Sequence, residues 1–260
     1  MDWHEGDLEI GGVRIHYYRR GMGRPLVLAH GASDNGRCWG RVAAALQDEY
    51  DIVAYDARYH GLSDGPEGGF LAGGEDLVAV VEALGLERPA IMGHSMGART
   101  VAQAAGTHPE SFRCAILEDP PWRDETAAAP PRTVGPDLTP LPVAEIVAAG
   151  RQQSPMWHED EFPDWAESKK QFRPPPDWRT RIPSIAAAWR EVATAIAVPT
   201  LLVTGGNAER GRIVNSHSAA EAAKLNPRIE VVRFEEAGHN VRREAFDGFV
   251  AAVRQFLARH

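Results

Sequence analysis

Gly93-His94-Ser95-Met96-Gly97 is the stretch that decides the fold. A short apolar run, Pro89 to Met92, precedes it, and a small-residue segment of helical period, Met96 to Gly106, follows it. Glycines two residues before and after a serine are typical of a sharp strand-to-helix turn, in which the serine backbone is strained and neighbouring backbone approaches closely. We therefore expect Ser95 to project from the carboxyl end of a buried strand.

On both sides of this turn, apolar runs rich in β-branched residues alternate with helix-period segments. This alternation predicts an α/β fold, a mostly parallel eight-stranded sheet flanked by helices on both faces. Gly11-Gly12 favours a tight hairpin between the first two strands, and hence an antiparallel start to the sheet. The expected strands are Asp7 to Ile10, Val13 to Arg19, Pro25 to Ala29, Tyr50 to Tyr55, Pro89 to Met92, Arg113 to Leu117, Thr200 to Thr204 and Ile229 to Phe234.

The composition changes between Pro120 and Trp189, where 13 of the 19 prolines and five of the seven tryptophans lie. Proline breaks regular ladders, so this stretch is not expected in the sheet. We interpret residues 121–197 as an inserted helical cap, and residues 1–120 with 198–260 as the core domain. Short cap helices are predicted at Val143 to Ala149, Asp164 to Phe172 and Ile185 to Ala195.

The bulk composition excludes several classes of protein. A chain of 260 residues with 43% hydrophobic content can bury a large core. The net charge of −8 disfavours nucleic acid and anionic membranes as partners, and no apolar run is long enough to span a bilayer. Cys38 and Cys114 indicate neither a disulfide framework nor a metal site. We expect a cytoplasmic monomer or homodimer that acts on a small molecule without metal or cofactor.

A serine hydroxyl needs a base within hydrogen-bond reach and a third group that orients that base. We predict His239 as the base, because it lies in a loop between the last expected strand and the terminal helix. The orienting carboxylate is expected after the strand Thr200 to Thr204, where Glu209 is the only acid in the loop, and Glu209 is our prediction. Glu118 and Asp119, at the end of the preceding strand, remain alternatives.

Acyl transfer also needs backbone N–H groups directed at the developing oxyanion. The amide of Met96, immediately after the serine, is one predicted donor. The second is expected from the turn His30-Gly31-Ala32-Ser33, which follows the third strand, and we assign it to Ala32.

Together these motifs resemble the α/β-hydrolase family of serine esterases and lactonases over nearly the whole chain. The resembling stretches are His30-Gly31-Ala32-Ser33, Asp56-Ala57-Arg58-Tyr59-His60-Gly61-Leu62-Ser63-Asp64, Gly93-His94-Ser95-Met96-Gly97 and Gly238-His239. The resemblance implies an acyl-enzyme mechanism, since members that cleave epoxides or carbon–halogen bonds use aspartate where this chain has Ser95. Two positions depart from the family pattern: Tyr59 replaces a glycine, and Glu209 stands where aspartate is more usual.

The resemblance implies a carboxylic ester or lactone as substrate. Cap tryptophans favour a bulky or aromatic molecule, and the expected substrate contacts are Tyr59, His94, Trp122, Trp157 and Trp165. One alternative keeps the same residues but changes the reaction, to hydrolysis of a diketone carbon–carbon bond or to cofactor-free peroxide chemistry. A second alternative is a receptor-like protein that keeps these residues but has little turnover.

Overall fold

The apolar runs of the sequence form eight strands of one sheet in the computed structural model, which describes residues 2–65, 73–123, 138–175 and 188–260. The spatial order is β1-β2-β4-β3-β5-β6-β7-β8. The first three strands in that order pair antiparallel and the others pair parallel. The strands are β1 (His4–Ile10), β2 (Val13–Gly21), β3 (Arg24–Ala29), β4 (Tyr50–Tyr55), β5 (Ala90–His94), β6 (Cys114–Glu118), β7 (Thr200–Gly205) and β8 (Ile229–Phe234).

The hairpin at the start of the sheet follows from its glycines. Gly11 and Gly12 both adopt positive φ, 57° and 75°, which L-residues with side chains rarely adopt. Ile10 consequently pairs with Val13 across a two-residue turn. This confirms the antiparallel start.

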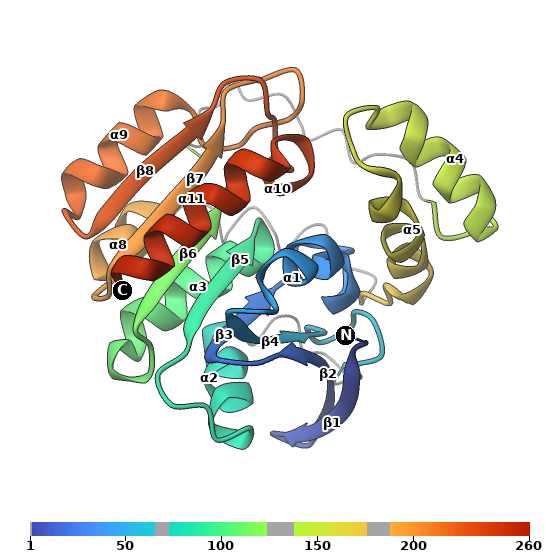
Figure 1. Ribbon diagram of the computed structural model, residues 1–260, viewed down its shortest axis with the longest axis horizontal. Helices are drawn as coiled ribbons and strands as arrows, with labels where there is room; N and C mark the ends of the chain where they lie inside the picture. The colour runs from blue at the N-terminus through green and yellow to red at the C-terminus, as the bar shows by residue number, and fades with distance from the viewer. Residues whose placement is uncertain (1, 66–72, 124–137, 176–187) are drawn as a thin grey trace.

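Helices cover both faces of the sheet, as expected (Figure 1). In β3, Val27 and Ala29 face one apolar cluster while Leu26 and Leu28 face the other, which explains why residues 26–29 are all apolar. The first face carries α2 (Gly74–Ala83), α3 (Met96–Thr107), α8 (Trp189–Ala195) and α9 (Ser216–Leu225), and the second carries α1 (Gly40–Leu46) and α11 (Phe246–Arg259). The short helices are η1 (Gly36–Trp39), η2 (Pro109–Ser111), η3 (Glu159–Glu161) and α10 (Val241–Glu244).

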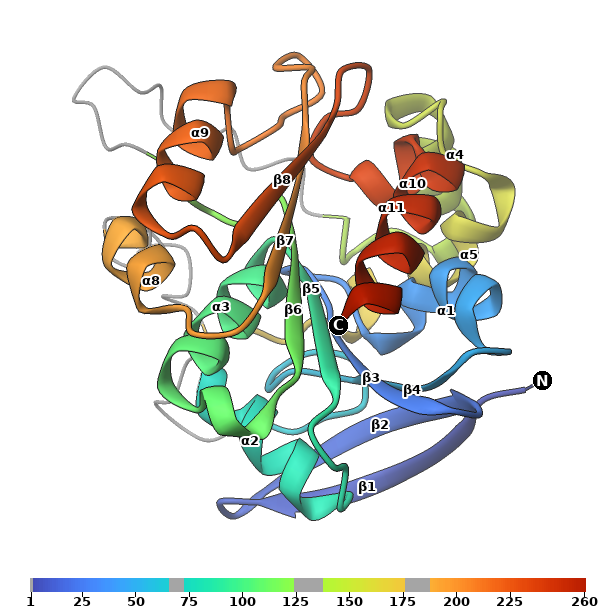
Figure 2. The same ribbon diagram turned by 60° about the vertical axis from the view of Figure 1, so that its left-hand side comes forward.

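Two helices stand apart from the sheet, at the right of Figure 1: α4 (Val143–Gln153) and α5 (Phe162–Gln171). Lys169 of α5 ties this pair to the turn after β3, because its Nζ lies 2.8 Å from the Ser33 carbonyl oxygen and 2.9 Å from Asp34 Oδ1. In contrast, α8 packs with α3 and α9 on the sheet (Figure 2). The division into core and cap stays a prediction.

Two further properties agree with the composition. Cys38 and Cys114 are free and buried. None of the described helices is long and apolar enough to cross a bilayer.

Candidate active site

The turn after β5 has the strained geometry that its sequence indicates. Ser95 adopts φ 53° and ψ −111°, and its carbonyl accepts the first backbone bond of α3, from Arg99 N–H at 3.1 Å. A Cβ atom on Gly97 would lie 2.1 Å from the Ala29 carbonyl oxygen, and one on Gly93 would lie 2.3 Å from the Gly97 carbonyl carbon. The two glycines are therefore needed for the strand, turn and helix to pack this closely.

The neighbouring strand ends in register with this turn. His94 pairs with Glu118 in the parallel ladder of β5 and β6, and Ser95 N–H donates to the Glu118 carbonyl at 2.9 Å. The next residue, Asp119, also adopts a positive φ, 41°. The backbone after β5 and the backbone after β6 therefore both turn at the same edge of the sheet, where the parallel strands have their carboxyl ends.

Asp119 holds the predicted base. His239 Nδ1 lies 2.6 Å from Asp119 Oδ2, so the ring donates its Nδ1 proton to the carboxylate and leaves Nε2 free as an acceptor. The carboxylate is fully buried and also accepts from the backbone N–H groups of Ile213 and Val214, at 2.8 and 2.9 Å. These three donors orient the carboxylate.

Glu209, our first prediction for the orienting acid, lies elsewhere. The residue is exposed, and its own N–H donates to Asn207 Oδ1 at 2.9 Å in a surface turn after β7. The loop after β7 does contact Asp119, but through the backbone N–H groups of Ile213 and Val214 and not through the Glu209 side chain. The structure therefore places Asp119, one of the two alternatives, where Glu209 was expected.

Glu118, the other alternative, binds Arg242 and not His239. Its Oε1 accepts from Arg242 N–H at 2.8 Å, and its Oε2 accepts from the Arg242 guanidinium at 3.1 Å. Burial raises the pKa of Glu118, although Arg242 opposes the shift. Successive residues of one strand end thus face two different partners.

His94 links the serine turn directly to His239. Its Nε2 donates to the His239 carbonyl oxygen at 3.0 Å, and the ring centroids lie 4.7 Å apart. Burial, with the Arg242 charge, lowers the pKa of His94 well below its usual value, so the ring is neutral near pH 7. The residue before Ser95 therefore fixes the backbone of the histidine that Asp119 orients.

The turn after β3 packs against the serine turn. A Cβ on Gly31 would lie 2.6 Å from His94 Nδ1. His30 secures the turn: its Nδ1 donates to the Gly31 carbonyl at 2.8 Å, and its Nε2 accepts from Ala57 N–H at 2.9 Å. Within the described residues, the amides of Ala32 and Met96 donate to no other protein group, which leaves both free for a ligand oxygen.

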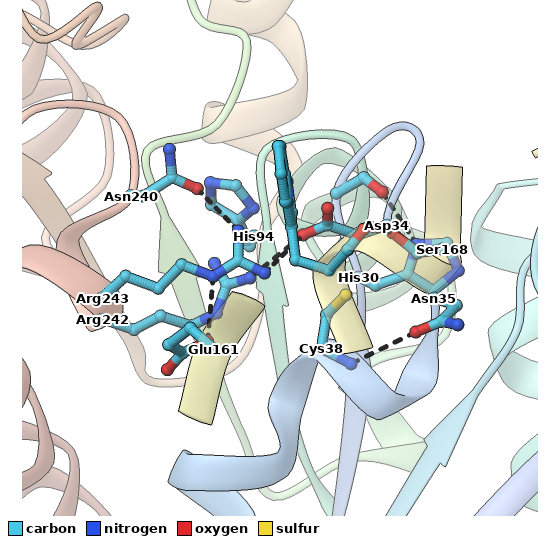
Figure 3. Close-up of polar contacts among 12 residues, drawn as sticks. His30, Asp34, Asn35, Cys38, His94, Glu161, Ser168, Asn240, Arg242 and Arg243 are labelled. Atoms are coloured by element: carbon cyan, nitrogen blue, oxygen red, sulfur yellow. Dashed lines mark hydrogen bonds and ion pairs between the residues drawn. The ribbon is translucent and has the colours of Figure 1, made fainter. Parts of the chain in front are cut away.

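A buried charged cluster joins the turn after β3 to α10 and α5 (Figure 3). Arg242 and Arg243 of α10 converge on Asp34 Oδ2, at 3.2 and 3.1 Å, and Lys169 holds Asp34 Oδ1. Burial alone would raise the pKa of Asp34, but Arg243, Lys169 and Arg242 hold it well below its ordinary value. The sequence reasoning missed this cluster, because its members are distant along the chain.

The aromatic residues proposed for substrate contact are largely packed against protein. Trp122 is buried and stacks on Trp189, with centroids 5.6 Å apart, within the core. Trp157 is enclosed by three groups: it stacks on Phe162, meets Trp165 edge-on and carries the Arg243 guanidinium 4.3 Å from its centroid. Their role in substrate binding stays a prediction.

Tyr59 is buried, with φ 69°, in the loop after β4. Asp56 organises that loop by accepting from Gly36 and Leu62 N–H groups, each at 2.7 Å. Trp178, in the stretch that the sequence predicts to be a cap, lies outside the described residues.

The model of the alpha/beta hydrolase family matches residues 26–252. The chain belongs to this family. It is 31% identical to N-formylmaleamate deformylase of Pseudomonas putida over 97% of this chain and 96% of that protein. It is 26% identical to 2-(acetamidomethylene)succinate hydrolase of Mesorhizobium japonicum over 96% of this chain and 94% of that protein.

Solved structures show the same fold. The crystal structure of E-2-(acetamidomethylene)succinate hydrolase has a TM-score of 0.81 at 21% identity, covering 98% of this chain and 99% of that one. That of the N-formylmaleamic acid deformylase from Pseudomonas putida S16 has a TM-score of 0.77 at 25% identity, covering 96% of this chain and 100% of that one. These matches confirm the α/β-hydrolase fold.

Proposed function

We propose that this hydrolase transfers an acyl group from a small substrate to Ser95 and then to water. The observation that supports this most is the 2.6 Å contact between His239 Nδ1 and Asp119 Oδ2, in a loop that His94 joins to the serine turn. An imidazole held in this tautomer presents a free Nε2 to the nucleophile.

In the proposed reaction, His239 takes the Ser95 proton as Oγ attacks the substrate carbonyl. Ala32 and Met96 N–H groups stabilise the oxyanion, and their lack of other acceptors in the described part of the chain supports this role. His239 then gives the proton to the leaving group and activates the water that releases the acid. Asp119 keeps its hydrogen bond to Nδ1 and stabilises the imidazolium.

We propose an N-acyl bond as the bond that is cleaved. The two relatives aligned over nearly their whole length are named for N-formylmaleamate and 2-(acetamidomethylene)succinate, both N-acylated carboxylates. An ester or lactone, the expectation from sequence, uses the same steps with an easier leaving group, so esters serve as probes of the machinery.

The test combines covalent labelling with turnover. A fluorophosphonate should label Ser95, located by peptide mass mapping, and Ser95→Ala should lose labelling and at least ~10³-fold of turnover. Ser111→Ala, in η2, is the matched serine control and should behave as wild type.

N-formylmaleamate, p-nitrophenyl acetate, a lactone and a ring-cleavage diketone should be compared in parallel. Release of formate from the N-formyl compound, dependent on Ser95, supports the proposal. Turnover confined to the ester and lactone would overturn the N-acyl assignment. Labelling of Ser95 without turnover of any substrate would favour the receptor-like alternative.

A further inference from the structure

The turn after β3, which carries the Ala32 amide, has a backbone conformation that its sequence does not favour. Asp34 N–H donates to the Gly31 carbonyl oxygen at 3.1 Å, so Ala32 and Ser33 are the two central residues of the turn. Ser33 adopts φ 61°, a left-handed value that glycine normally supplies at the second central position of a type II turn. A serine in this conformation is strained, and it persists only where surrounding contacts hold it.

The core holds the first half of this turn. His30 Nδ1 donates to the Gly31 carbonyl at 2.8 Å, and Gly31 packs so closely on His94 that a Cβ would lie 2.6 Å from Nδ1. The Ala32 amide lies between this fixed half and the strained Ser33. Its direction therefore also depends on what holds Ser33.

Lys169 of α5 uses every donor it has on the second half of the turn. Its Nζ lies 2.8 Å from the Ser33 carbonyl oxygen, 3.1 Å from Ser33 Oγ and 2.9 Å from Asp34 Oδ1. An ammonium group has three N–H donors, so each of them has an acceptor here. The side chain is only 11% exposed, which keeps these hydrogen bonds largely out of water.

Ser168, the preceding residue of α5, contributes less. Its Oγ lies 3.0 Å from the Ser33 carbonyl oxygen, but its single proton has a closer acceptor in the Trp165 carbonyl, at 2.7 Å. Lys169 is therefore the main contact between α5 and the strained residue.

The same network reaches the histidine loop. Asp34 Oδ2 accepts from Arg242 and Arg243 of α10, which begins two residues after His239. Figure 3 shows Asp34 between these arginines and Ser168 of α5. One buried carboxylate thus joins α5, the turn after β3 and the helix that follows the catalytic base.

We propose that Lys169 is a positioning residue, which holds the turn after β3 in the conformation that directs the Ala32 N–H group at the oxyanion. This assignment rests on the proposed acyl transfer at Ser95. A donor stabilises the transition state only where it is aimed at the developing charge, and a small displacement removes much of its effect. Because all of its donors are bound to the turn, Lys169 acts through the turn and not by binding substrate.

The first experiment is steady-state hydrolysis of p-nitrophenyl acetate, an ester without a charge for a lysine to bind. In Lys169→Met, kcat should fall about tenfold to a hundredfold, less than the roughly 10²–10³ that loss of a whole oxyanion donor costs. Acylation and deacylation both pass through an oxyanion, so kcat and kcat/KM should fall together and KM should stay within about threefold of wild type. Lys169→Arg, which restores cationic donors, should recover part of the loss.

Lys170→Met is the matched control on the same helix. The Lys170 ammonium binds the carbonyl oxygens of Thr139 and Leu141 and not the turn, so this variant should behave as wild type.

The second experiment measures inhibition by phenylboronate, whose boron accepts Ser95 Oγ and becomes a tetrahedral anion that resembles the oxyanion intermediate. In Lys169→Met, the inhibition constant should rise by about the same factor as kcat/KM falls. Lys169→Gln, which keeps two N–H donors, should show the same proportion with smaller changes, and it carries the test if Lys169→Met does not fold. Thermal unfolding of each variant shows that it is folded at the assay temperature.

Three results would overturn the assignment of Lys169. They are a kcat in a folded Lys169 variant within about twofold of that in Lys170→Met, a raised KM at unchanged kcat, and a loss of kcat without weaker binding of phenylboronate. A lower Tm with unchanged kcat is an instance of the first result and would make the contact purely structural. Absence of Ser95-dependent turnover in wild type would instead overturn the proposed function, and the role of Lys169 with it.

Discussion

Replacing Asp119 by asparagine is the sharpest test of how the histidine is oriented. The carboxylate accepts three hydrogen bonds, from Ile213 N–H, Val214 N–H and His239 Nδ1. Asparagine offers one acceptor oxygen, so in either orientation its NH₂ group faces at least one N–H donor. If NH₂ faces His239, the ring must accept at Nδ1 and carry its proton on Nε2, and it can no longer deprotonate Ser95.

The expected magnitude follows from these contacts. Losing the correct tautomer and the stabilised imidazolium should lower kcat by about 10³–10⁴, equivalent to roughly 4–5.5 kcal/mol of transition-state stabilisation. The buried donor that loses its acceptor should also lower the free energy of unfolding by about 1–3 kcal/mol. The effect on catalysis should thus exceed the effect on stability.

The assay is steady-state hydrolysis of p-nitrophenyl acetate, with urea unfolding of the same samples. Glu209→Gln is the control, and its exposed surface position predicts activity within about twofold of wild type. If Asp119→Asn keeps more than a tenth of the activity, or Glu209→Gln loses as much as Asp119→Asn, the assignment of Asp119 is wrong.

Two further predictions concern stability. Gly97→Ala should lower the free energy of unfolding, measured in urea, by more than about 3 kcal/mol, because the new Cβ would lie 2.1 Å from the Ala29 carbonyl oxygen. Gly40→Ala is the control and should be tolerated, since the nearest atom would be 3.6 Å from its Cβ. Equal effects of the two substitutions would contradict the packing argument. Asp34→Asn should lower stability at pH 7 by about 3 kcal/mol or more. Since the pKa of Asp34 is depressed in the folded protein, the carboxylate contributes its full stability above the unfolded pKa near 3.8 and loses that contribution as pH falls below this value. The difference in stability between wild type and Asp34→Asn should therefore shrink in acid. A difference that stays constant with pH would refute this account.

The strands of the sheet and the turn that carries Ser95 follow from local sequence, and both could be predicted from it. The strand Tyr50–Tyr55 and the strand Ile229–Phe234 have the predicted bounds, because β-branched and aromatic residues, which favour extended backbone, occupy four of the six positions in each. The Ser95 turn was predictable for a similar reason, since its glycines leave space that any side chain would fill. His239 followed from its place after the last strand.

Only the tertiary structure decided which carboxylate meets that histidine. Asp119 and His239 are 120 residues apart in the sequence. Neither the spacing of apolar residues nor the residues typical of turns predicts the direction of a side chain that follows the end of a strand. The positive φ of Asp119 and the return of the loop after β7 direct the carboxylate to His239, whereas Glu209 points to solvent in a turn of its own.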